Sequence, residues 1–179
     1  MTAQEPNPPV DETEEAAAPW GIPRGVERND VERFLAHAIQ LEREAARRYE
    51  ELTAAMQTDG NAELKAFFAR MAHFSRLHLA EAEARGGFRD LPPMAESDYD
   101  WPDGTSPETA DWAGVDAQMD AGDALRLALA SERRGHAYYA AIAATTSDAE
   151  LRRIASEFAD EESQHVVELE KLIAARAIA

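Results

Sequence analysis

Two stretches of the chain repeat the same spacing of apolar residues around a single inward-facing acid, and their glutamates lie 90 positions apart. The first stretch comprises Leu35, Ala38, Glu42, Ala45, Tyr49 and Leu52, and the second Leu125, Ala128, Glu132, Gly135, Tyr139 and Ile142. Steps of three and four residues mark one face of an α-helix, so Glu42 and Glu132 are predicted to point into the protein interior. An ionised carboxylate is costly there unless a positive charge meets it. Two such acids in an internal repeat predict a metal site.

The same periodicity predicts four long helices. We place them at residues 29–60, 62–85, 120–144 and 147–175. Asn29 followed by Glu32, and Ser147 followed by Glu150, have the spacing of a capping box at a helix start. Gly60 suits the left-handed position that commonly ends a helix.

The connections between these helices differ greatly in length. Two or three residues join the first helix to the second and the third to the fourth, so each pair is predicted to form an antiparallel hairpin. Residues 86–119, which include four prolines, separate the pairs, and Trp101 and Trp112 are expected to pin this segment to the helices. A disordered linker is the alternative. The predicted fold is all-α, a four-helix bundle of two antiparallel helical hairpins joined by a long crossover.

Composition excludes several classes of function. The chain has 35 acidic and 18 basic residues, a net charge of −17, which argues against nucleic acid and anionic membranes as partners. It has no cysteine, so disulfides, iron–sulfur clusters, thiolate zinc sites and thiol catalysis are excluded.

The N-terminal region differs from the rest of the chain. Residues 1–19 hold five acids, four prolines and no basic residue, and are predicted to be a disordered tail in front of one bundle domain at 20–179. The first ten residues lack the basic and apolar regions of a signal peptide, and no apolar run approaches about 20 residues. We therefore expect a cytoplasmic location.

The second and fourth predicted helices also share a register. One stripe holds Leu64, Phe67, Met71, Ser75, His78 and Ala82, and the other Leu151, Ile154, Phe158, Glu162, His165 and Leu169. Glu162 and His165 are three residues apart, so both can reach one ion from the same helical face. In the second helix His78 is kept, but Ser75 occupies the position that corresponds to Glu162.

These residues resemble the ferritin-like di-iron carboxylate superfamily, most closely its rubrerythrin-type branch without the rubredoxin module. The resemblance covers about residues 29–86 and 120–175, and it includes the strings LKAFFARMAHFSRLH and LRRIASEFADEESQH. It implies a ferritin-like bundle with one glutamate from each of two helices and a Glu-x-x-His motif from each of the other two.

The resemblance also implies a ligand set. Glu42 and His78 would hold one metal ion, Glu132 and His165 another, and Glu162 would bridge them. Because Ser75 cannot replace the second bridging acid, the sequence predicts three carboxylates where the family has four. A dinuclear site completed by water or hydroxide, a single ion and no ion all remain open. Rubrerythrins also carry an additional glutamate at the position of Gly135.

The expected function is iron binding with ferroxidase or peroxidase-type redox activity, which uses oxygen or peroxide. Iron suits mixed carboxylate and imidazole ligands, and manganese or zinc would also fit. The alternative is a non-catalytic bundle with a degenerate metal site that serves as a structural or interaction module. A homodimer is left open. Tyr49 and Tyr139 are expected to donate hydrogen bonds to carboxylates across the bundle.

Overall fold

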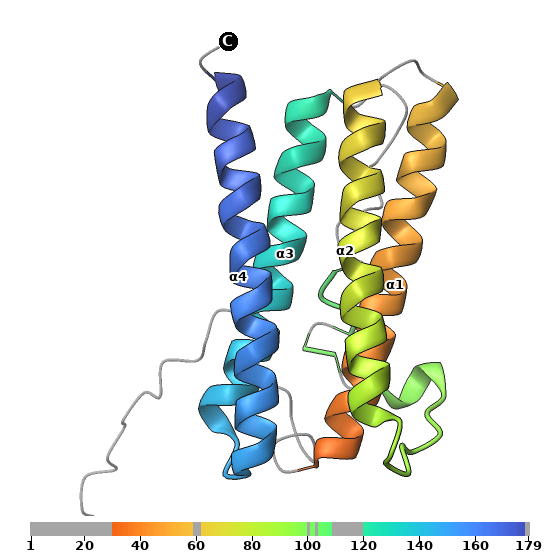
Figure 1. The fold of residues 1–179 in the computed structure, drawn as a ribbon, viewed down its shortest axis with the longest axis vertical. Helices are drawn as coiled ribbons and strands as arrows, with labels where there is room; N and C mark the ends of the chain where they lie inside the picture. The colour runs from red at the N-terminus through yellow and green to blue at the C-terminus, as the bar shows by residue number, and fades with distance from the viewer. Residues whose placement is uncertain (1–29, 59–61, 100, 103, 109–119, 178–179) are drawn as a thin grey trace, which may run out of the picture.

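The part of the chain that the structure describes contains four long helices and one short 3-10 helix (Figure 1). They are α1 (Val31–Thr58), α2 (Ala62–Gly86), η2 (Glu96–Asp98), α3 (Ala121–Thr145) and α4 (Ala149–Ala177). The computed structural model describes residues 30–58, 62–99, 101–102, 104–108 and 120–177, and no strand occurs within these ranges. The predicted all-α four-helix bundle is therefore confirmed. The expected tail at 1–19, Asn29, Gly60 and Trp112 lie outside the described residues.

Aspartates cap the helix starts. Asp30, Asp120 and Asp148 directly precede α1, α3 and α4. Each accepts a hydrogen bond from a backbone N–H in the first turn of its helix, at 3.0 Å for Asp30 and 2.8 Å for the other two. The carboxylates satisfy amides that lack a partner within the helix and favour its positive end. The predicted capping residue of the fourth helix, Ser147, is wrong by one position, because the side chain of Asp148 makes the capping bond and the helix begins at Ala149.

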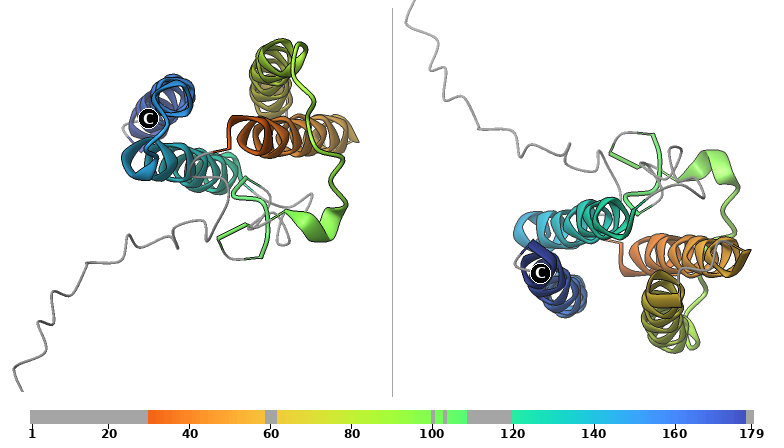
Figure 2. Two further views of the ribbon diagram at one scale, coloured as in Figure 1. Left: turned by 90° about the horizontal axis from the view of Figure 1, so that it is seen from below. Right: turned by 90° about the horizontal axis from the view of Figure 1, so that it is seen from above.

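The helices pair as two antiparallel hairpins, α1 with α2 and α3 with α4. Figure 2 shows the two hairpins end-on, with the described part of the crossover passing around α1 towards α3. The ring of Trp101 packs edge-on against His37 of α1 and Tyr138 of α3, with centroids 5.1 and 5.7 Å away. Trp101 therefore pins the crossover to the bundle, as predicted.

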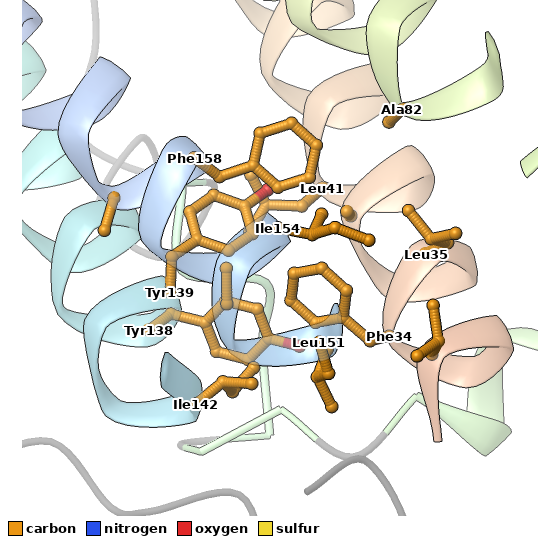
Figure 3. Packing of buried hydrophobic residues seen from close by; sticks show 14 of the residues in the cluster. Phe34, Leu35, Leu41, Ala82, Tyr138, Tyr139, Ile142, Leu151, Ile154 and Phe158 are labelled. Carbon is orange, nitrogen blue, oxygen red and sulfur yellow. The ribbon is translucent and has the colours of Figure 1, made fainter. Parts of the chain in front are cut away.

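Two groups of buried apolar side chains fill the interior. One joins residues such as Phe34, Leu41, Tyr138, Tyr139, Leu151 and Phe158 (Figure 3). The other joins residues such as Tyr49, Phe68, Met71, Ala124, Ala128 and Leu169. The two groups occupy successive parts of every helix, and the acids of the candidate site fall between them in the sequence. None of the described helices is both long and apolar enough to cross a membrane.

Candidate metal centre

The five predicted ligands converge from all four helices. Glu42, Glu132 and Glu162 are buried, and the two histidines are largely covered. His78 Nδ1 lies 3.8 Å from Glu42 and 3.5 Å from Glu162. His165 Nδ1 lies 3.1 Å from Glu132 and 3.6 Å from Glu162. Glu162 thus lies next to both histidines, as the residue expected to bridge should.

Two buried tyrosines hold Glu42 and Glu132 by reciprocal hydrogen bonds between α1 and α3. Tyr49 of α1 donates to Glu132 Oε1 at 2.8 Å, and Tyr139 of α3 donates to Glu42 Oε1 at 3.1 Å. In each acid the other oxygen, Oε2, faces a histidine. Burial and nearby carboxylates raise the pKa of both tyrosines well above its ordinary value, so they remain donors. The predicted role of the two tyrosines is confirmed.

A sixth residue, Glu108, enters the site from the crossover and was not among the predicted ligands. Its side chain is 3% exposed, and one of its carboxylate oxygens lies within 4.8 Å of oxygens of both Glu42 and Glu162. Glu108 is thus a fourth buried carboxylate beside the three that the sequence predicts. Ser75 is buried but turns to its own helix, where its hydroxyl donates to the carbonyl of Met71 at 3.3 Å.

Gly135 provides the room for Glu108. A Cβ atom at this position would lie only 2.8 Å from Glu108 Oε1, so any larger residue would force the carboxylate to move from its place. A glycine on an otherwise inward-facing helical stripe indicates a close approach by another group. That was the one signal in the sequence that pointed to an incoming side chain, although it did not identify which acid of the crossover would fill the space.

The pKa values of the acids separate into two kinds. Burial and repulsion from neighbouring carboxylates raise the pKa of Glu42, Glu108 and Glu162 well above the ordinary value. Burial acts the same way on Glu132 and is the largest single cause, but the hydrogen bonds with His165, Glu162 and Tyr49 and the attraction of His165 together outweigh it and lower the pKa. Burial alone would lower the pKa of His165, whereas Glu132 and Glu162 raise it to about 10. Without metal, a charged His165–Glu132 pair therefore stands beside three acids that favour the protonated form.

The donor set suits divalent metal ions. Two groups of side chains have ligand atoms within 4.8 Å of one another, and Glu162 belongs to both. One contains His78, Glu162 and His165, and the other Glu42, Glu108 and Glu162. Glu162 Oε2 is buried and accepts no hydrogen bond from the described residues. A buried carboxylate oxygen with no donor needs a cation or a proton, so these residues can hold a metal ion.

The chain is similar to a solved structure. No protein-family model and no curated protein matches it. The crystal structure of an uncharacterized conserved protein from Magnetospirillum magnetotacticum MS-1 has 39% sequence identity and a TM-score of 0.68. The match covers 82% of this chain and 95% of that chain. Since the relative is itself uncharacterized, function has to be argued from the site.

Proposed function

We propose that this chain, which belongs to the same family as the uncharacterized conserved protein from Magnetospirillum magnetotacticum MS-1, is a ferritin-like protein that binds two divalent metal ions and oxidises Fe(II). The observation that carries the proposal is the meeting of four buried glutamates and two histidines in the bundle interior. Bound iron would supply the redox step, in which electrons pass from Fe(II) to oxygen or peroxide. The resemblance to rubrerythrin-type proteins supports iron over manganese and zinc.

Charge balance favours two ions. Four carboxylates carry four negative charges when ionised, which match the charge of two divalent cations. Positive charge reaches these acids from the two histidines and from the Arg134 guanidinium, which attracts Glu108 while it donates to the backbone of the crossover, but the pKa values of Glu42, Glu108 and Glu162 stay raised. Taking up metal would therefore release the protons that the buried acids hold and remove a desolvation cost.

The histidine geometry also favours two ions. The rings of His78 and His165 are nearly parallel, with an interplanar angle of 9° and centroids 5.0 Å apart. The lone pair of an imidazole nitrogen lies in the ring plane, so two parallel rings direct their lone pairs within two separate planes. Dinuclear sites place their ions roughly 3.5–4 Å apart, a separation that suits one ion per ring. Glu162, adjacent to both rings, would bridge.

The remaining residues would orient the ligands. Tyr49 and Tyr139 each hold one carboxylate oxygen, which leaves the second oxygen for an ion. Glu161 is half-buried, and its Oε2 lies 3.6 Å from His78 Nε2, so it would help to orient the His78 ring.

The test is Fe(II) binding and oxidation by the full chain. Protein loaded anaerobically should hold two irons, and exposure to oxygen or peroxide should oxidise them faster than iron in buffer. Glu162→Gln should lose both binding and oxidation, because it removes the shared ligand. Glu168→Gln, on an exposed position of the same helix, should behave as wild type. Absence of metal binding would leave the non-catalytic interaction module as the function.

A further inference from the structure

A short stretch of the crossover is buried against the bundle and hydrogen-bonded to α3. Ser106, Pro107 and Glu108, here called the crossover strap, are all buried. The Ser131 hydroxyl donates to the Glu108 carbonyl at 2.7 Å, and Arg134 Nε donates to the Pro107 carbonyl at 2.6 Å. Both donors lie on α3, so buried carbonyls that would otherwise lack partners are satisfied by that helix. The bonds fix the backbone from which the Glu108 side chain enters the site.

The strap delivers a charge to a place where it is unfavourable without a cation. Glu108, Glu42 and Glu162 approach from three separate segments, the crossover, α1 and α4, and their oxygens lie within 4.8 Å of one another. Ionised carboxylates at such a distance in a water-poor interior repel strongly. A divalent ion among the same oxygens reverses the sign of the interaction. Metal binding should therefore stabilise the docked strap more than it would stabilise a surface loop.

We propose that Glu108 is a metal ligand supplied by the crossover, and that metal binding fastens the strap to the bundle. This inference rests on the proposed function, since it assigns a further ligand to the same centre. Binding and docking are linked reciprocally, because whatever stabilises the docked strap must strengthen metal binding by the same free energy. Gly135 belongs to the device, since it leaves the space that Glu108 fills.

Two variants separate this role from a purely structural one. Glu108→Gln keeps the size and most hydrogen-bonding capacity of the side chain but removes its charge. Gly135→Ala leaves every ligand unchanged but places a methyl group only 2.8 Å from Glu108 Oε1, so the carboxylate has to move. Alanine also favours the helix by up to about 1 kcal/mol, so this variant is expected to fold. Glu168→Gln is the matched charge control.

The readouts are metal stoichiometry and amide hydrogen exchange in the full chain, with Mn²⁺ as a redox-stable probe and anaerobic Fe²⁺ as a second. Wild type should bind two ions and show slower exchange in peptides covering residues 104–108 when loaded. Either variant should lower the affinity for one of the two ions at least about tenfold and abolish the slower exchange of residues 104–108. In a Glu108→Ala background, Gly135→Ala should have no further effect on metal affinity.

The outcomes distinguish this inference from the proposed function. If wild type binds two ions and Glu108→Gln binds them equally well, with the same protection of residues 104–108, Glu108 is not a ligand while the metal function stands. If wild type binds neither probe, both fall together. Weakened binding in Glu108→Gln without any change in the exchange of the strap would overturn the coupling.

Discussion

The Tyr49 hydroxyl donates a 2.8 Å hydrogen bond to Glu132, and so ties α1 to the acid on α3 that also accepts from His165. This bond fixes one carboxylate oxygen and directs the other towards the histidine. The mirrored pair, Tyr139 and Glu42, makes the same arrangement in the opposite direction. The repeated spacing of glutamate and tyrosine in the sequence thus produces two matching hydrogen bonds in the bundle interior.

Tyr49→Phe should weaken both the fold and the centre. The change leaves Glu132 with a buried oxygen that has lost its donor, at a cost of about 1.5–3 kcal/mol. For a chain of this size we expect the metal-free melting temperature to fall by roughly 5 °C, and metal affinity to fall about tenfold. Calorimetry and metal titration measure the two effects. Tyr99→Phe, on the crossover, is the control, and an equal loss in that variant would contradict the account.

The metal-free protein should lose stability as pH rises from 6.5 to 10. The pKa of His165 is raised from 6.5 to about 10, so across this interval the folded state holds a proton that the unfolded state has released. The raised pKa values of Glu42, Glu108 and Glu162 act in the same direction above their ordinary range. The lowered pKa of Glu132 acts oppositely, but only at acidic pH.

Metal should reverse or flatten that dependence. A metal ion takes the place of the protons on His165 and the acids, so affinity increases with pH and offsets the loss. Melting temperatures from pH 6.5 to 9, with a chelator and with excess Mn²⁺, provide the comparison. A metal-free melting temperature that stays constant or rises over this range would contradict the assignment of a charged His165.

Ser75→Glu should restore metal binding to the Glu108→Gln variant. The substitution places a carboxylate one turn before His78, at the register that Glu162 has relative to His165 on α4. In the metal-free wild type the same change should lower the melting temperature, because it adds an acid to an interior that already holds four. Titration of the double variant and melting of the single variant are the measurements. No rescue, together with unchanged stability, would mean that position 75 does not face the centre.

Much of the centre was predictable because helical periodicity is local. The spacing around Glu42, Glu132 and Glu162 determines which face each residue occupies, and the bundle brings those faces together. Glu108 was not predictable in this way, since the crossover has no periodicity and which of its acids turns inward depends on bonds to Ser131 and Arg134.

The departures from the resembled family are understood together once Glu108 is included. Ser75 on α2 and Gly135 on α3 occupy positions at which that family carries a glutamate. Glu108 occupies the space beside Gly135, so four buried acids from different segments meet in the bundle interior. The sequence predicts three of the four buried carboxylates, because helical periodicity says nothing about the crossover, where Glu108 lies.

The most direct test of the account is anomalous diffraction from crystals loaded with Fe(II) under anaerobic conditions. We predict two iron peaks roughly 3.5–4 Å apart, one beside His78 and one beside His165, with Glu162 between them and Glu108 at the ion nearer Glu42. Crystals of Glu162→Gln should show neither peak at full occupancy. A fully loaded wild-type crystal without iron density beside either histidine would contradict the central claim.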